Sequence, residues 1–153
     1  MDFHEIVDPL EKQKIVREIL ESLPEWFGIV ESREEYIRDS SELPCFGAFN
    51  GKKFVGFVCL KETGKDTVEL HVIGVLKEYH RQGIGRKLFS LAKNYAESKG
   101  YSFMQVKTVK MGTFDEYDKT NLFYISLGFK EFEVFPTLWD EQNPCQVYVM
   151  YIK

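Results

Sequence analysis

The sequence predicts an α/β fold within one domain that spans residues 1–153. Two observations support this prediction. Apolar residues follow the two-residue period of strands between residues 45 and 75, whereas residues 84–98 follow the 3.6-residue period of a helix. A chain of this length buries enough apolar surface to form a core without a metal or disulfide. We therefore expect helices packed on a mixed sheet.

The first forty residues predict one strand and two helices. Residues 1–7 suit a short strand, and Asp8 followed by proline marks the start of a helix, with the acid at the N-cap. Apolar residues then recur at helical spacing. A second helix is expected over residues 32–39, because Ser32 and Glu35 form a capping box.

The next segment predicts three strands. Residues 45–49 and 54–60 flank an Asn-Gly pair, which is the strongest two-residue signal for a hairpin. A third strand is expected over residues 67–75, after a turn that contains Gly64.

The remaining elements follow a glycine-rich loop. The first of them is an amphipathic helix that ends before Gly100, a residue suited to the C′ position. The predicted elements are a helix over 84–98, a strand over 101–109, a short helix over 117–126, and strands over 129–135 and 146–152.

The charge distribution excludes one class of partner and suggests another. A net charge of −4 argues against a chain that binds nucleic acid electrostatically. Residues 111–145 contain seven acidic and two basic residues, a local net charge of −5. This acidic bias is typical of a solvated face, and it also suits a site that attracts a cationic partner.

The cysteines and the apolar runs suggest a cytoplasmic protein. Cys45, Cys59 and Cys145 have neither a disulfide-framework pattern nor metal-ligand spacing, so we expect small buried side chains and no metal site. No basic N-terminal region precedes an apolar stretch, as a signal peptide would require. No apolar run approaches the length of a membrane span, so no membrane partner is expected.

The strongest chemical signal is the loop His-Arg-Gln-Gly-Ile-Gly-Arg-Lys at residues 80–87, which joins a predicted strand to a predicted helix. The first amides of a helix have no internal partner, and with the helix dipole they bind anions. Arg81, Arg86 and Lys87 add positive charge, so a phosphate or pyrophosphate is the expected ligand. Leu88 replaces the third glycine of a Rossmann fingerprint, and the P-loop motif is absent.

Two segments together resemble the GNAT superfamily of N-acetyltransferases. Residues 75–88 resemble its acetyl-CoA motif, which reads Gln or Arg, two residues, Gly, one residue, then Gly or Ala. His80 stands at the first position of that motif. Residues 120–129 resemble the second motif, an aromatic residue and Tyr, three residues, then Gly-Phe, with Tyr117 where the family often has Asn. The resemblance spans about residues 43–152.

The resemblance implies a GNAT-type fold. Its central sheet is mixed, mostly antiparallel and of about seven strands, with helices on both faces. A β-bulge and splay at the fourth strand would lie near Gly74. The segment 136–139, expected as a loop between the last two strands, lies where the family often closes its acceptor site.

The resemblance also implies acetyl-CoA as co-substrate. The strand backbone near Val75 would bind the pantetheine arm and donate to the oxyanion, and Tyr124 would protonate the leaving thiolate. The expected cofactor-binding residues are Ile73, Gly74, Val75, His80, Arg81, Gln82, Gly83, Ile84, Gly85, Arg86, Asn121 and Tyr124.

Two residues are candidates for the general base. Strand alternation puts Glu69 and His71 on one face of the predicted strand, which suits either a solvated side or a cleft. By resemblance, Glu69 has the position of the catalytic glutamate in the histone-modifying branch. His71 has the position of a histidine in the serotonin-acetylating branch. Binding of the amine in its neutral form, with neither base, is the third alternative.

The expected function is that of an acetyl-CoA-dependent N-acetyltransferase of the EC 2.3.1 class. It would transfer acetyl directly to a primary amine, with a small, cationic molecule as the preferred acceptor. One alternative is a protein acceptor, at a lysine or the N-terminus. Another is a non-catalytic acyl-CoA-binding module, against which the presence of Tyr124 and Glu69 argues. The resemblance also allows a homodimer.

Overall fold

The computed structural model describes residues 1–153 and confirms the predicted order of elements. The chain forms seven strands, four α-helices and one short 3-10 helix. These are β1 (Asp2–Ile6), α1 (Pro9–Glu21), α2 (Val30–Ser40), β2 (Cys45–Asn50), β3 (Lys53–Gly64), β4 (Thr67–Val75), η1 (Lys77–Tyr79), α3 (Ile84–Ser98), β5 (Phe103–Val109), α4 (Asp115–Ser126), β6 (Lys130–Asp140) and β7 (Asn143–Tyr151).

The residues group into two compact units, and each is described by itself. The first unit comprises Met1–Lys61 and Leu70–Tyr95, and the second comprises Glu62–Glu69 and Ala96–Lys153. The organisation of the whole chain as one domain stays a prediction. None of the helices combines the length and the apolar character needed to cross a bilayer.

The strands form one sheet in the order β1-β2-β3-β4-β5-β7-β6. β4 and β5 run parallel, with Thr67–Glu69 paired to Phe103–Gln105. The pairs β1–β2, β2–β3, β5–β7 and β6–β7 are antiparallel. This arrangement confirms a mixed, mostly antiparallel sheet of seven strands. The bulge and splay near Gly74 stay a prediction.

In the first unit, α1 packs its apolar side against the strands. Asp8 caps the helix as predicted, because its carboxylate accepts the backbone N–H of Glu11 at 2.9 Å. Ile15 and Ile19 are almost wholly buried and belong to the same core cluster as Phe57 of β3. The periodicity of the sequence therefore identified the buried side of this helix correctly.

The second helix begins earlier than the capping box predicted. α2 starts at Val30, and its N-cap residue Ile29 makes no side-chain cap. The backbone N–H of Arg33 already bonds to the carbonyl of Ile29 at 3.0 Å. The cap predicted at Ser32 is wrong, because Ser32 lies inside the first turn rather than before it.

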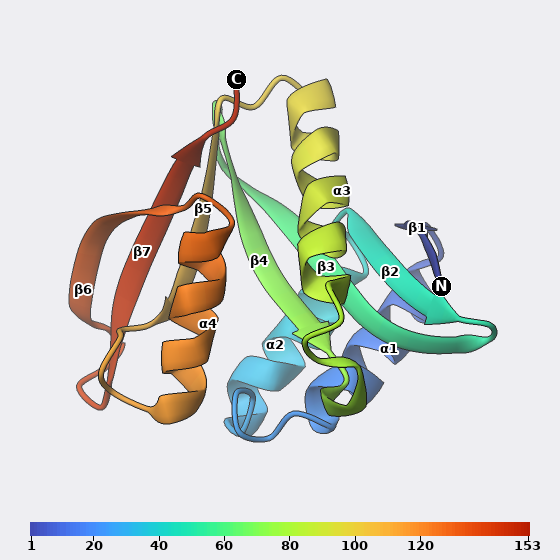
Figure 1. Ribbon diagram of the computed structural model, residues 1–153, viewed down its shortest axis with the longest axis horizontal. Coiled ribbons are helices and arrows are strands. Elements are labelled where there is room, and N and C mark those ends of the chain that lie inside the picture. The colour runs from blue at the N-terminus through green and yellow to red at the C-terminus, as the bar shows by residue number, and fades with distance from the viewer. The chain divides into compact units, whose positions relative to one another are not determined.

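Helices cover both faces of the strands in the first unit, with α3 on the face opposite α1 and α2 (Figure 1). A Cβ atom at Gly74 would lie 3.0 Å from Ile19 Cγ2 of α1 and 3.1 Å from a ring carbon of Phe57. A Cβ atom at Gly56 would lie 3.2 Å from a methyl carbon of Leu88 in α3. Both glycines therefore allow a close approach of helix and strand, and the prediction of helices on both faces is confirmed.

Cys45 and Cys59 form a disulfide between β2 and β3, where we expected separate buried thiols. The two residues are direct cross-strand partners, and their Cα atoms lie 4.3 Å apart. Their spacing along the chain could not reveal this proximity, which depends on the register of the hairpin. Cys145 is a buried free cysteine.

In the second unit, the last two strands form a longer hairpin than predicted. β6 extends to Asp140, so the segment 136–139 is part of a strand and not a loop. The turn is held by the Asp140 carboxylate, which accepts the backbone N–H of Asn143 at 2.9 Å. The pairing with β7 is irregular after Phe135, which is consistent with the missing N–H of Pro136.

We expect Gly74→Ala to lower the free energy of unfolding by about 1–3 kcal/mol, the usual cost of overpacking a dense core. The added methyl group would crowd Ile19 and Phe57, which are both fully buried. Urea denaturation measures the effect. Gly64→Ala is the matched control, because a Cβ atom there meets nothing within 4 Å. Equal losses in the two variants would contradict the packing argument.

Candidate active site

The loop between β4 and α3 has a backbone that suits an anion. Arg81 has a φ of 61° and Gly83 a φ of 79°, so two residues of this short loop are left-handed. Loops that mix left- and right-handed residues turn successive amides toward one side and form anion-binding nests. Arg81 adopts its conformation at an energetic cost, because it carries a Cβ atom. Such strain, directly before a helix N-terminus, is consistent with the predicted pyrophosphate site.

His80 closes the same loop on itself. Its Nε2 lies 2.6 Å from the carbonyl oxygen of Val75, and its ring meets the edge of the Trp26 indole at a centroid distance of 5.9 Å. The ring therefore joins the end of β4 to the middle of the loop. The contact of His80 with a phosphate stays a prediction, whereas its contact with the protein backbone is direct.

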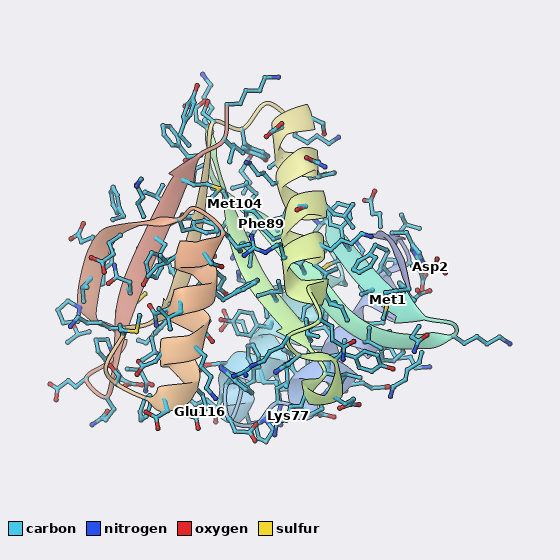
Figure 2. All side chains as sticks on the ribbon, in the orientation of Figure 1. Met1, Asp2, Lys77, Phe89, Met104 and Glu116 are labelled. Carbon is cyan, nitrogen blue, oxygen red and sulfur yellow. A yellow bond between two sulfur atoms is a disulfide. The ribbon has the colours of Figure 1, made fainter.

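The start of the loop is anchored by η1. The backbone N–H of Leu76 donates to the carbonyl of Val55 at 2.9 Å, and Asn50 donates to the Tyr79 hydroxyl at 3.1 Å. Lys77, labelled in Figure 2, forms an ion pair with Glu25. The Lys77 ammonium donates to that carboxylate and lowers its pKa below the ordinary value. These contacts hold the loop from two sides.

The other predicted residues of the loop have mainly supporting contacts. The Gln82 side chain donates to the carbonyl of Glu78 at 3.2 Å, and Ile84 is buried at the first turn of α3. The Lys87 ammonium lies 4.7 Å from the centre of the Phe3 ring. The side chains of Gln82, Ile84 and Lys87 are therefore engaged in contacts within the first unit.

His71 lies in a polar and aromatic cluster of the first unit. Its Nε2 is 3.4 Å from Oδ2 of Asp39, and its ring meets the Tyr36 ring edge-on at a centroid distance of 5.1 Å. Tyr36 and Asp39 lie three residues apart on α2 and so share a face of that helix. The sequence analysis did not single out either residue. Their i, i+3 spacing was visible, but their approach to β4 was not.

Glu69, the other candidate base, lies in the second unit and is held by a cation. Its Oε1 is 2.5 Å from the Lys107 ammonium, and 8% of its side chain is exposed. This pairing compensates the burial of a carboxylate. Burial raises the pKa of the Cys145 thiol to about 11, and the charges of Lys107 and Glu69 have smaller, opposite effects on it. Cys145 is therefore protonated at neutral pH.

Asn121 connects three elements of the second unit. Its side-chain amide donates to the carbonyls of Val109 at 2.8 Å and Tyr117 at 2.7 Å. Its oxygen accepts the Tyr148 hydroxyl at 2.6 Å, and burial raises the pKa of Tyr148 above the ordinary value. The side chain is completely buried, so it fixes α4 to β5 and β7. Its contact with a cofactor stays a prediction.

Tyr124 lies one turn further along α4 and is also buried. Its ring packs against Phe129 at a centroid distance of 5.9 Å and against Tyr148 at 6.4 Å. The network around Asn121 therefore also supports the face of α4 that carries Tyr124.

The predicted site residues are divided between the two units. The first unit contains His71, Ile73, Gly74, Val75 and the loop residues up to Arg86, whereas the second contains Glu69, Asn121 and Tyr124. The roles that the resemblance gives them stay predictions.

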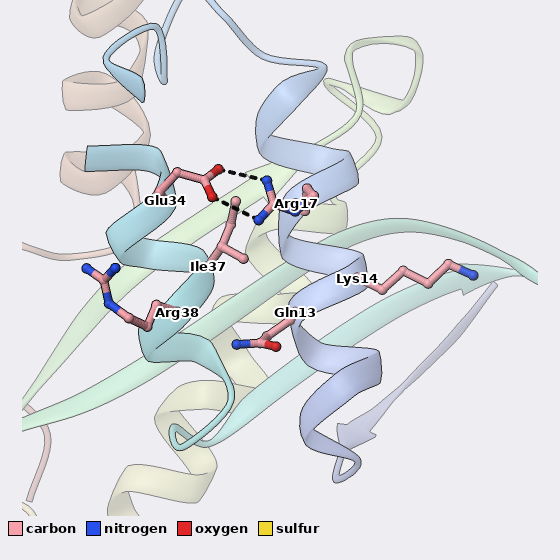
Figure 3. A pocket seen from close by; sticks show the side chains of 6 residues that line it. All are labelled: Gln13, Lys14, Arg17, Glu34, Ile37 and Arg38. Carbon is pink, nitrogen blue, oxygen red and sulfur yellow. Dashed lines mark hydrogen bonds and ion pairs between the residues drawn. The ribbon is translucent and has the colours of Figure 1, made fainter. Parts of the chain in front are cut away.

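A separate pocket of about 250 Å³ lies between α1 and α2 (Figure 3). Arg17 and Glu34 form a bidentate ion pair across it, at 2.7 and 2.9 Å. The guanidinium hydrogen bonds keep the pKa of the Glu34 carboxyl below the ordinary value. Its lining residues are Gln13, Lys14, Arg17, Glu34, Ile37 and Arg38. None of them is a predicted site residue, and the ion pair joins two helices.

We expect Asn121→Ala to lower the free energy of unfolding by about 3 kcal/mol, because it leaves buried polar groups without partners. Tyr148→Phe removes one of the same hydrogen bonds and is expected to cost about 1 kcal/mol. Chemical denaturation measures both, with Thr120→Ala on the same helix as the control. Unchanged stability of Asn121→Ala, together with weaker binding of acetyl-CoA, would instead favour a direct contact of Asn121 with that molecule.

Comparisons with known proteins identify the family of the chain and agree with its fold. The chain matches the model of the Acetyltransferase (GNAT) family over residues 13–129. A structure assigned to the GNAT family from Desulfovibrio desulfuricans is 18% identical, with a TM-score of 0.87 over 99% of each chain. Among curated proteins, none matches the sequence.

Two further solved structures have named activities. An aminoglycoside 6'-N-acetyltransferase complexed with coenzyme A is 20% identical, with a TM-score of 0.78 over 100% of this chain and 98% of that chain. The ribosomal-protein-S18-alanine N-acetyltransferase from Escherichia coli is 18% identical, with a TM-score of 0.77 over 99% of this chain and 95% of that chain. At these identities the likeness concerns the fold. The family model, however, covers most of the sequence, and the chain therefore belongs to the GNAT family of acetyl-CoA-dependent acetyltransferases.

Proposed function

We propose that this enzyme acetylates the primary amine of a small, cationic molecule. The observation that carries this proposal is the acidic character of residues 111–145, which all belong to the second unit and have a net charge of −5. A concentration of acidic residues attracts cations over several ångströms. Asp115, Glu116 and Asp118 occupy the first turn of α4, the helix that carries Tyr124. The aminoglycoside acetyltransferase among the similar folds supports this acceptor class by analogy.

A protein acceptor is the second candidate. The favouring observation is the similar fold of the ribosomal-protein-S18-alanine N-acetyltransferase. A panel that includes polyamines, aminoglycosides and peptides with a free N-terminus separates the two candidates. Turnover of the peptides alone would overturn the small-molecule proposal.

Acetyl-CoA supplies the acetyl group as an activated thioester. We propose that the loop amides from Arg81 to Arg86 bind its pyrophosphate, and that the backbone of Ile73, Gly74 and Val75 lies along its pantetheine arm. Two observations support the loop assignment: the left-handed residues at 81 and 83, and the helix that begins at Ile84. His80 supports it indirectly, because the ring fixes the loop to Val75.

We propose Tyr124 as the general acid that gives a proton to the leaving sulfur. A phenol is protonated at neutral pH and needs no shifted pKa for this role. Its position in the second family motif supports the assignment, as does the packing that holds the ring between Phe129 and Tyr148.

For the base, we favour His71 over Glu69. The Lys107 ammonium holds the Glu69 carboxylate at 2.5 Å, so accepting a proton would cost Glu69 a buried ion pair. His71 lies 3.4 Å from the Asp39 carboxylate instead of beside a cation, and an imidazole is the side chain that exchanges protons near neutral pH.

We expect Tyr124→Phe to lower kcat about 100-fold, the lower end of the usual contribution of a general acid. The Kd for acetyl-CoA should change little, because the variant keeps the ring. Steady-state kinetics and calorimetric titration with acetyl-CoA measure the two quantities. Unchanged turnover at every pH would remove Tyr124 from the reaction, and absence of binding by the wild-type protein at millimolar acetyl-CoA would end the whole proposal.

We expect His80→Ala to raise the KM for acetyl-CoA about fivefold with a smaller effect on kcat, because it loses one hydrogen bond that shapes the loop. His80→Gln should recover part of the loss, since an amide can also donate to the Val75 carbonyl. His4→Ala, which changes an exposed histidine of β1, is the control. A fall in kcat at constant KM would contradict the loop role.

A further inference from the structure

The turn of the β2–β3 hairpin contacts η1, the short helix that directly precedes the proposed pyrophosphate loop. Asn50 and Lys53 face each other across this turn as the last pair of the hairpin. The Asn50 amide donates to the Tyr79 hydroxyl at 3.1 Å, and the Lys53 ammonium lies 5.5 Å from the centre of the Tyr79 ring. Both members of the pair that closes the hairpin therefore converge on one tyrosine.

The ion pair beside Tyr79 contributes less than the tyrosine itself. Lys53 Nζ lies 3.5 Å from a carboxylate oxygen of Glu78, but 57% of the Lys53 side chain and 61% of the Glu78 side chain are exposed. Exposed ion pairs are screened by solvent and contribute little. Tyr79 is half-buried, and its ring lies within the distance at which aromatic rings attract an ammonium group. Its ring and hydroxyl therefore provide the main side-chain contact between the turn and η1.

Tyr79 is connected to the proposed pyrophosphate loop by short steps. Arg81, two residues later, has a φ of 61°, which a residue with a Cβ atom adopts at an energetic cost. The Gln82 side chain folds back and donates to the Glu78 carbonyl at 3.2 Å. A 3-10 helix of three residues has weak hydrogen-bond geometry and needs support from its surroundings. A shift of Tyr79 would therefore move the backbone that has to present its amides to an anion.

We infer that Tyr79 is a positioning residue for acetyl-CoA, because it transmits the position of the β2–β3 turn to the loop that would hold the pyrophosphate. The hairpin suits this role, since its strands are paired along their length and joined by the disulfide between Cys45 and Cys59. Tyr79 acts through the loop backbone and takes no part in acetyl transfer itself. The inference rests on the proposed binding of the pyrophosphate by the loop.

The test is the variant Tyr79→Leu, which removes both the ring and the hydroxyl. We expect the Kd for acetyl-CoA to rise about tenfold, because the loop loses a hydrogen bond and a cation–π contact that fix it. The value of kcat at saturating acetyl-CoA should stay within about twofold of wild type. Calorimetric titration with acetyl-CoA and steady-state kinetics measure the two quantities. An unchanged Kd, or a fall in kcat at constant Kd, would overturn the inference.

A double-mutant cycle isolates the hydrogen bond to the turn. Tyr79→Phe and Asn50→Ala each remove one partner of this bond, so each should raise the Kd for acetyl-CoA about threefold to fivefold. The double variant should raise it no further, whereas additive effects would overturn the role of this contact.

Tyr101→Phe is the matched control. It also removes a hydroxyl hydrogen bond, to Glu62 at 2.6 Å, and should leave the Kd for acetyl-CoA unchanged. Thermal unfolding identifies any variant that misfolds. Tyr79→Phe removes a single oxygen atom and keeps the test decisive if Tyr79→Leu does not fold.

Hydrogen exchange gives a readout that a merely structural role would not change. Coupling between two sites is reciprocal, so acetyl-CoA that needs the turn in place also stabilises the turn. We expect saturating acetyl-CoA to slow the exchange of the amides of residues 50–53 in the wild-type protein and to have a smaller effect in Tyr79→Leu. Equal slowing in both proteins would overturn the inference and leave the cofactor site intact. Absence of acetyl-CoA binding by the wild-type protein would refute the proposed function as well.

Discussion

The fold depends on a strand that must be buried and yet carries two ionisable side chains. β4 lies between β3 and β5 in the sheet, and its side chains Val68, Leu70 and Val72 are buried. Burial of a charge is costly unless a partner compensates it. In the second unit Lys107 compensates the charge of Glu69, and in the first unit the Asp39 carboxylate lies 3.4 Å from the His71 ring. The chemistry of the two candidate bases therefore differs because their partners differ.

The loop after β4 is also held in its conformation by polar contacts. Its left-handed residues and its approach to α3 require a fixed backbone, and His80 provides one of the fixed points through the Val75 carbonyl. His80 stands where the family motif has Gln or Arg, and its polar side chain holds the loop. In the second unit, Asn121 holds α4 in a similar way, because its side chain is hydrogen-bonded to Val109 and Tyr148.

Much of the fold could be predicted from the sequence, because its signals are local. Asp8 caps α1, the β2–β3 hairpin turns at Gly51 directly after Asn50, and α3 begins and ends as predicted. The misses depend on longer-range geometry. The Cys45–Cys59 bond required the hairpin register, and β6 could continue through Pro136 because it is an edge strand. For the candidate site, strand parity identified Glu69 and His71, but only tertiary structure could reveal Lys107 and Asp39.

The edge contact between Trp26 and His80 gives the enzyme an internal optical probe. Indole emission responds to the charge and the position of a neighbouring imidazole. The chain has two tryptophans, and Trp139 lies on the exposed edge strand β6. Replacement of Trp139 by phenylalanine would leave Trp26 as the sole indole. The intrinsic fluorescence of this variant would then report on the position of His80 and so on the conformation of the loop.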